Sequence, residues 1–139
     1  MINMSMTVRR QIYFHAESVY PEECCGFLLG AEVDGFRKIT DALQVPNAEE
    51  TRRDHRFLIT PDYYQKAETV ARERNLRLLG FYHSHPDHKA LPSQYDVEQG
   101  LPWFVSIIIA VTGGTASHMT AWVLNENRMR YDQQTMLVI

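Results

Sequence analysis

The feature that most constrains the fold is a short apolar run, residues 78–82, which ends in two aromatic side chains. Its length and composition predict a buried strand. Pro86 has no backbone N–H to give to a ladder, so we expect this strand to run from Arg77 to His85 and to stop there. The remainder of the chain must then supply the strands and helices that flank it.

Two histidines lie at the end of this expected strand. Alternate side chains of a strand share a face, so His83 and His85 point the same way and Ser84 points the other way. Two imidazoles on one face can grip a divalent metal. After a loop, a short helix is expected to begin at Ser93, and its first turn would return Asp96 to the pair. Two His and one Asp leave a fourth tetrahedral position for water, as in catalytic zinc sites.

Ser93 and Asp96 also have a structural interpretation. A Ser followed three residues later by an acid is a capping box, in which each side chain accepts a backbone N–H at the start of a helix. A carboxylate held by zinc should cap poorly, so the two interpretations compete for Asp96. The combination of the histidine pair, the proline and the two fixed offsets favours the metal site.

Elsewhere, hydrophobic periodicity and turn residues predict alternating helices and strands. Asp34-Gly35 is a strong hairpin signal, and Thr7 and Thr60 are expected to cap two helices. The expected helices span residues 7–20, 60–75 and 93–99, and the expected strands span residues 24–31, 36–45, 57–59, 77–85, 103–111, 117–124 and 129–139. This order predicts an α/β domain with a mixed β-sheet flanked by helices.

The composition is that of a globular protein, with 139 residues of which 45% are hydrophobic and 22% charged. This length suits one domain, residues 1–139, with a single core. The net charge of −3 argues against nucleic-acid binding, which needs a basic face, although six arginines between residues 52 and 77 could form a local patch. No signal peptide and no apolar run of ~20 residues is visible. We expect a cytoplasmic protein without a nucleic-acid or membrane partner; its oligomeric state is left open.

The spacing of these histidines, the serine and the aspartate resembles the signature of a known family. The His83-Ser84-His85-Pro86 stretch, the seven residues between His85 and Ser93, and the following Asp96 resemble the JAMM (MPN+) metallopeptidase motif. That family also has a glutamate three residues before a glycine near the N-terminus, and Glu23 stands in this position before Gly26. The resemblance implies a deaminase-like JAMM/MPN fold over nearly the whole chain.

The resemblance also implies an activity, namely zinc-dependent hydrolysis of amide or isopeptide bonds after the Gly-Gly tail of ubiquitin or a ubiquitin-like protein, with one zinc per chain. Few residues follow Asp96 before the next expected strand, so the insertions of ubiquitin-chain-specific members are missing. The chain is therefore similar to compact, stand-alone prokaryotic forms that act on ubiquitin-like sulfur-carrier proteins. We expect such a tail to bind by strand addition beside the central strand.

Two further residues receive catalytic roles. The resemblance implies that Glu23 takes a proton from the attacking water and later gives it to the leaving amine. Glu22 is the alternative, because strand alternation does not decide which glutamate faces the metal; the family's offset from Gly26 selects Glu23. The Ser93 hydroxyl, on the turn beside the metal, is expected to donate a hydrogen bond to the oxyanion.

Two other functional classes compete with this hypothesis. A catalytically inactive scaffold of the same fold would bind partners, but such proteins lose metal ligands that this chain retains. A nucleoside deaminase would need His-x-Glu and a later Cys-x-x-Cys, whereas Cys24 and Cys25 are adjacent and lie upstream. We expect both thiols to be reduced core residues. His88 is a further possible ligand, but its offset from the strand pair is wrong.

Overall fold

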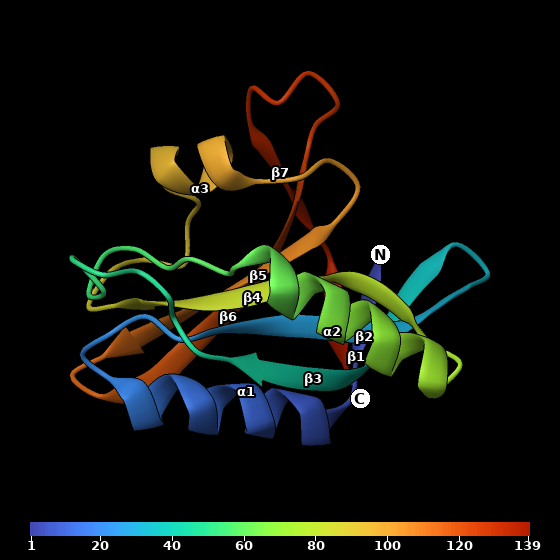
Figure 1. Ribbon diagram of the computed structural model, residues 1–139, viewed down its shortest axis with the longest axis horizontal. Helices are drawn as coiled ribbons and strands as arrows, with labels where there is room; N and C mark the ends of the chain where they lie inside the picture. Colours follow the sequence, from blue (N-terminus) through green and yellow to red (C-terminus); the bar gives the residue numbers. More distant parts are fainter.

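The computed structural model describes residues 1–139 and contains one eight-stranded sheet. The strands are β1 (Ile2–Met4), β2 (Cys25–Val33), β3 (Phe36–Val45), β4 (Arg77–Pro86), β5 (Val105–Thr112), β6 (Thr115–Leu124), β7 (Tyr131–Gln134) and β8 (Met136–Val138). The helices are α1 (Met6–Val19), α2 (Pro61–Glu73) and α3 (Gln94–Gln99). The sheet order is β7-β6-β5-β4-β2-β3-β1-β8 (Figure 1). Parallel and antiparallel pairs occur together, so the predicted mixed α/β sheet is confirmed.

Strand β4 lies inside the sheet, parallel to β5 and antiparallel to β2. Residues 79–86 are all buried, as a strand with two paired edges and two covered faces requires. Gly80 allows β5 to approach, because a Cβ at this position would lie 2.0 Å from the carbonyl oxygen of Val105. The predicted buried central strand is therefore confirmed, with Pro86 as its last residue.

Different helices cover the two faces of the sheet (Figure 1). On one face, Ile12 of α1 packs in a core with Leu28 and Tyr82. On the other face, Ala67 of α2 packs with Phe81 and its neighbours. Because side chains alternate along β4, His83 shares the α2 face with Phe81, whereas Tyr82 turns toward α1.

A second apolar cluster lies on the same face as the histidines, over β5 and β6. It consists of Ala90, Ile108, Ala110, Trp122, Leu124 and Tyr131. His83 and His85 stand beside Ile108 and Ala110 in the parallel register. The histidine pair thus lies between this cluster and the α2 core, where apolar side chains on both sides keep water from the imidazoles.

Several expected boundaries are corrected. Helix α1 begins at Met6, and its N-cap is Ser5, whose hydroxyl accepts the N–H of Val8 at 3.1 Å; Thr7 is not the cap. Residues 57–59 form no strand. Strand β1 was not expected, and it fills the gap between β3 and β8 with two parallel pairings. The hairpin around Asp34-Gly35 is confirmed as the β2–β3 pair.

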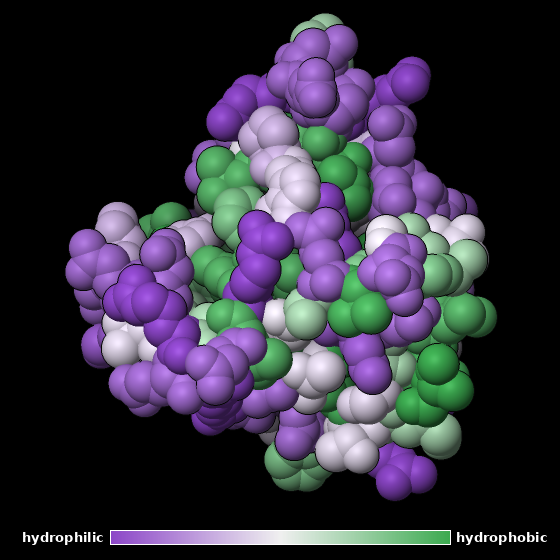
Figure 2. Space-filling view, turned by 90° about the vertical axis from the view of Figure 1, so that its right-hand side faces the viewer, coloured by the Kyte–Doolittle hydropathy of each residue, from purple (hydrophilic) through white to green (hydrophobic).

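The surface is mixed in hydropathy at the end where the β2–β3 hairpin lies. Figure 2 shows hydrophilic side chains over much of this end, with hydrophobic ones between them. Three of the six arginines that could have formed a basic patch are paired with acids: Arg52 with Asp54 at 3.7 Å, Arg74 with Asp41 at 2.6 Å and Arg77 with Glu32 at 2.8 Å. None of the three helices is long and apolar enough to cross a membrane.

Candidate metal centre

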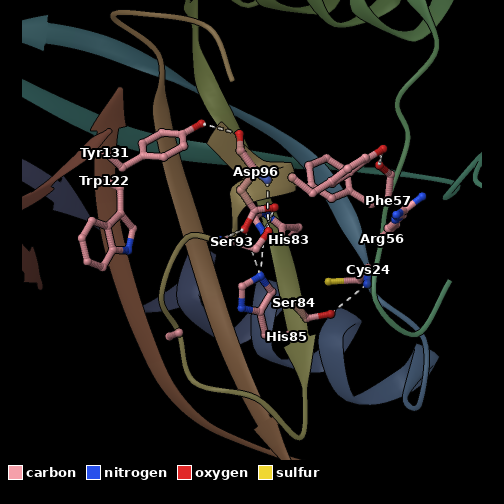
Figure 3. Close-up of polar contacts among 12 residues, drawn as sticks. Cys24, Arg56, Phe57, His83, Ser84, His85, Ser93, Asp96, Trp122 and Tyr131 are labelled. Atoms are coloured by element: carbon pink, nitrogen blue, oxygen red, sulfur yellow. Dashed lines mark hydrogen bonds and ion pairs between the residues drawn. The ribbon is translucent and has the colours of Figure 1, made fainter. Parts of the chain in front are cut away.

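The alternation of β4 sets the direction of the two histidines. His83 and His85 lie on one face, while Ser84 points to the opposite face, where its hydroxyl accepts the N–H of Cys24 at 2.8 Å. The N–H of Ser84 also donates to the carbonyl of Cys24 at 3.2 Å. These two bonds tie the end of β4 to the start of β2, and they fix the backbone from which both imidazoles project (Figure 3).

A short loop after β4 returns Asp96 to the histidines. Ser93 caps α3: its hydroxyl accepts the N–H of Asp96 at 3.1 Å, and its own N–H donates to Asp96 Oδ2 at 2.8 Å. The same carboxylate faces His83 through Oδ1 and His85 through Oδ2. Asp96 thus keeps its capping bonds while it faces the histidines, because two carboxylate oxygens with several lone pairs can accept from both sides.

Three potential ligands converge at this point (Figure 3). The Nε2 atoms of His83 and His85 are 3.1 Å apart, and they lie 3.3 Å and 3.2 Å from the nearer oxygens of Asp96. Ligand atoms about 2.0 Å from a tetrahedral zinc are about 3.3 Å from one another. The spacing and the N, N, O donor set therefore fit a zinc ion, and all three residues are buried.

The second nitrogen of His85 fixes the orientation of its ring. His85 Nδ1 lies 2.9 Å from the carbonyl oxygen of Lys89, so Nδ1 carries a hydrogen and Nε2 is left with a lone pair in the neutral ring. That lone pair faces Asp96 Oδ2. Two acceptors at this distance repel each other unless a proton or a cation lies between them, so the arrangement favours a positive species at the cluster.

Burial and charge pull the ionisation of the cluster in opposite directions. Burial alone would raise the pKa of Asp96, but His83 and His85 hold it well below its usual range. Burial lowers the pKa of His83, which Asp96 only partly opposes. For His85 the hydrogen bond and charge of Asp96 outweigh burial, and its pKa is raised. These directions favour an ionised Asp96 and a neutral His83, the forms that bind metal, whereas His85 favours a proton that it would release when a metal binds.

Glu23 lies beside this cluster, two residues before the first residue of β2. Cys25 is opposite His83 in the β2–β4 register, so Glu23 falls opposite His85 and on the same face. It is only 4% exposed, and its Oε1 has no hydrogen-bond partner. Burial raises the pKa of Glu23 to about 8, against the positive charge of His85. Glu22, by contrast, is exposed.

One neighbour of the cluster was missed by the sequence analysis. The ring of Phe57 stacks on the ring of His83, with centroids 4.5 Å apart and an interplanar angle of 23° (Figure 3). The segment that carries it is anchored on α3, where the hydroxyl of Tyr95 donates to the carbonyl of Phe57 at 3.3 Å. Phe57 begins an apolar triplet, residues 57–59, which predicted a strand. No neighbouring residue in the sequence indicates that its ring lies against a metal ligand.

The other candidate residues lie apart from the three ligand atoms. His88 is exposed on the loop after β4, and its ring is 5.2 Å from that of His55, centroid to centroid. Cys24 and Cys25 are free and buried. Burial raises the pKa of both thiols to about 12, so neither is a thiolate at neutral pH.

The comparisons with known proteins identify the family. Residues 5–125 match the family described as prokaryotic homologs of the JAB domain. Over 106 residues, the chain is 33% identical to a desampylase from Pyrococcus furiosus, an alignment that covers 75% of this chain and 68% of that one. The chain belongs to this JAB family. The resemblance to compact prokaryotic JAMM (MPN+) proteins is thereby confirmed.

Three other known proteins are also similar to this chain. A nuclear protein localization protein 4 homolog from Dictyostelium discoideum is 24% identical over 125 residues, which are 85% of this chain but 22% of that protein. A protein from Salinibacter ruber is 34% identical, with a TM-score of 0.78 over 99% of this chain and 91% of the other. A JAB1/MPN domain protein from Archaeoglobus fulgidus has a TM-score of 0.64 at 16% identity, over 100% and 97% of the two chains. The last likeness concerns the fold alone.

Proposed function

We propose that this chain, as one domain over residues 1–139, is a zinc-dependent hydrolase that cleaves the amide or isopeptide bond after the C-terminal Gly-Gly of a ubiquitin-like protein. The observation that carries the proposal is the buried, unpartnered carboxylate oxygen of Glu23 beside three convergent ligand atoms. Membership of the JAB family and the desampylase relative support hydrolysis of ubiquitin-like conjugates. A sulfur-carrier protein is the substrate class we infer.

In this proposal His83, His85 and Asp96 hold the zinc. A zinc ion bound there would lower the pKa of water and polarise the scissile carbonyl. The carbonyl of Lys89 accepts a hydrogen bond from Nδ1 of His85, which leaves Nε2 as the ligating nitrogen of the neutral ring. The stacked ring of Phe57 restricts rotation of the His83 ring. These contacts orient the ligands before metal arrives, as hydrogen bonds around metal sites generally do.

Glu23 moves the proton. It accepts one from the attacking water as the new C–O bond forms, and it delivers that proton to the amine as the C–N bond breaks, so that a carboxylic acid and an amine leave. A pKa of about 8, raised by burial, lets the carboxyl hold and release a proton near neutral pH. The hydroxyl of Ser93 uses a lone pair to cap α3, and its hydrogen remains free to donate to the oxyanion.

The route of the substrate differs from the sequence-based expectation. Strand addition beside β4 is wrong, because β2 and β5 already pair with both of its edges. An extended tail must therefore reach the cluster across the face of the sheet. The chain between β4 and α3 is only seven residues long, and it offers little surface to grip a folded ubiquitin chain. This favours a small carrier recognised through its tail.

The test offers the purified enzyme a ubiquitin-like sulfur carrier with an amide extension after Gly-Gly, and a matched carrier with Ala-Ala. We expect cleavage of the first alone, abolished by a chelator and restored by zinc. Binding of the tail without cleavage by the zinc-loaded protein would favour the inactive scaffold and overturn the proposal. Equal cleavage of both carriers would show that the approach to the metal does not select glycine.

A further inference from the structure

We propose that Asn47 is a positioning residue that holds Glu23 and Phe57 in register with the metal ligands. The inference rests on the proposed function, because it concerns how the proton-handling carboxyl is placed. Asn47 lies in the segment between β3 and α2, far in sequence from Glu23. None of its hydrogen bonds goes to the three ligand residues, so we expect its effect to pass through the backbones to which it is bonded.

The side chain of Asn47 uses its full hydrogen-bonding capacity. Nδ2 donates to the carbonyl of Glu23 at 3.2 Å and to the carbonyl of Arg56 at 2.9 Å. Oδ1 accepts the N–H of Glu49 at 3.0 Å and the N–H of Leu58 at 3.1 Å. An asparagine side chain has two donor hydrogens and two acceptor lone pairs, and here all four have backbone partners.

The chemistry of the partners fixes the orientation of the amide. If the oxygen and nitrogen of Asn47 exchanged places, an oxygen would face two carbonyl oxygens and an NH₂ would face two N–H groups. Only one orientation satisfies the four groups, so the donor side of the amide points to Glu23 and the acceptor side to Leu58. No aliphatic or acidic residue can make this set of bonds.

Glu23 needs such support because it precedes β2 and lies outside the sheet ladder. Its N–H donates to the carbonyl of Arg53 at 2.7 Å, and its carbonyl accepts from Asn47. Both backbone bonds of Glu23 therefore come from the segment between β3 and α2. Without the bond from Asn47, only the bond to Arg53 would hold the backbone of Glu23 to this segment, and a misplacement of about 1 Å can lower a rate about 100-fold.

The other two bonds bracket Phe57. Asn47 binds the carbonyl of the residue before it, Arg56, and the N–H of the residue after it, Leu58. The ring that stacks on His83 thus projects from a backbone pinned on either side. The side chain of Asn47 therefore links the backbone of Glu23 to the backbone on both sides of Phe57.

The alternative is that Asn47 merely shapes its own loop, as asparagines in turns commonly do. Asn125 provides the matched case. Its Oδ1 accepts the N–H groups of Met129 and Arg130 at 3.0 Å and 3.3 Å in the loop between β6 and β7. No bond runs from it to Glu23 or Phe57, so the same substitution at this position changes a loop and not the site.

The experiment compares Asn47→Asp with Asn125→Asp in the full chain. An aspartate at 47 keeps the acceptor for Leu58 but turns an oxygen toward the carbonyls of Glu23 and Arg56. We expect kcat on the carrier substrate to fall about 10- to 100-fold with little change in KM or in bound zinc. In a Glu23→Gln background, Asn47→Asp should cause no further loss. Asn125→Asp should keep the kcat of the wild type.

Amide hydrogen exchange supplies a readout that does not depend on activity. Asn47→Asp removes the bond to the carbonyl of Glu23, so the backbone of Glu23 should open more often. Its N–H, which donates to the carbonyl of Arg53, should then exchange roughly five- to tenfold faster, as expected when local opening costs one hydrogen bond less, while the Leu58 N–H stays protected. A wild type that does not hydrolyse any carrier would refute the proposed function, and the exchange result would still decide the role of Asn47. Unchanged exchange at Glu23, or a fall in kcat explained by lost zinc, would overturn the inference.

Discussion

Replacing Glu23 by Gln should make the metal-free protein more stable at neutral pH while it abolishes turnover. Glu23 is 4% exposed, and burial raises the pKa of its carboxyl from 4.5 to about 8. In the unfolded chain the same group ionises near 4.5. Gln has nearly the same shape and no charge, so the substitution isolates the cost of carrying an ionisable group at this position.

The sign of the effect follows from proton binding. Between pH 4.5 and about 8 the folded state holds a proton on Glu23 that the unfolded state has lost, so the free energy of unfolding falls as pH rises. Each pH unit in this interval contributes about 1.4 kcal/mol. From pH 5 to pH 7, Glu23→Gln should therefore gain about 2–3 kcal/mol of stability relative to the wild type.

The assay is urea unfolding of metal-free protein at pH 5 and pH 7, with Glu22→Gln as the matched control. Glu22 is exposed, so its substitution should leave the difference between the two pH values unchanged. Zinc loading should shrink the effect at Glu23, because a nearby cation favours the ionised carboxyl. If Glu23→Gln tracked the wild type at both pH values, Glu23 would not be buried in its neutral form, and the facing assigned to it would be wrong.

Two further substitutions test the frame that carries the site. Burial lowers the pKa of His15, whose Nδ1 lies 2.8 Å from the hydroxyl of Tyr82. On acidification the unfolded chain therefore protonates this histidine at a higher pH than the folded protein does, and stability is lost as pH falls below 6.5. His15→Gln should flatten this acid limb in urea unfolding between pH 5 and 7, and an unchanged slope would contradict it. Gly80→Ala would place a Cβ 2.0 Å from the carbonyl oxygen of Val105 and should cost roughly 1–3 kcal/mol or more; an unchanged melting temperature would show that β4 and β5 separate freely.

The parts of the site that follow from local rules could be predicted from the sequence. The two-residue period of a strand puts His83 and His85 on one face, and helix-capping chemistry puts Asp96 in the first turn of α3. Neither inference needs knowledge of distant residues. The buried strand and the Asp34-Gly35 hairpin were predictable for the same reason.

The choice between Glu22 and Glu23 could not be made from strand periodicity alone. It depends on the register between β2 and β4, which places Cys25 opposite His83 and is set by packing between segments almost 60 residues apart. Glu23 also precedes the strand, so the alternation rule does not strictly reach it. The resemblance to the family supplied the choice instead.

Other features were missed because they depend on contacts between remote segments. Strand β1 has only three residues, and it is stabilised by pairing with β3 and with β8 at the other end of the chain. Phe57 lies in an apolar triplet that resembles a strand, yet its position comes from α3, Asn47 and the ring of His83. Asp96 keeps both capping bonds while its carboxylate faces the two histidines, and this combination was not expected, because a carboxylate held by zinc should cap poorly.

The central claim is that His83, His85 and Asp96 form a metal centre, and metal analysis tests it most directly. Protein purified and loaded with zinc should hold one zinc per chain, measured by elemental analysis after extensive dialysis. His85→Ala should lose the metal, whereas His88→Ala, which changes an exposed histidine on the adjoining loop, should retain it. A wild type that remains metal-free after zinc loading, or a His85→Ala variant that still binds one zinc per chain, would contradict the account.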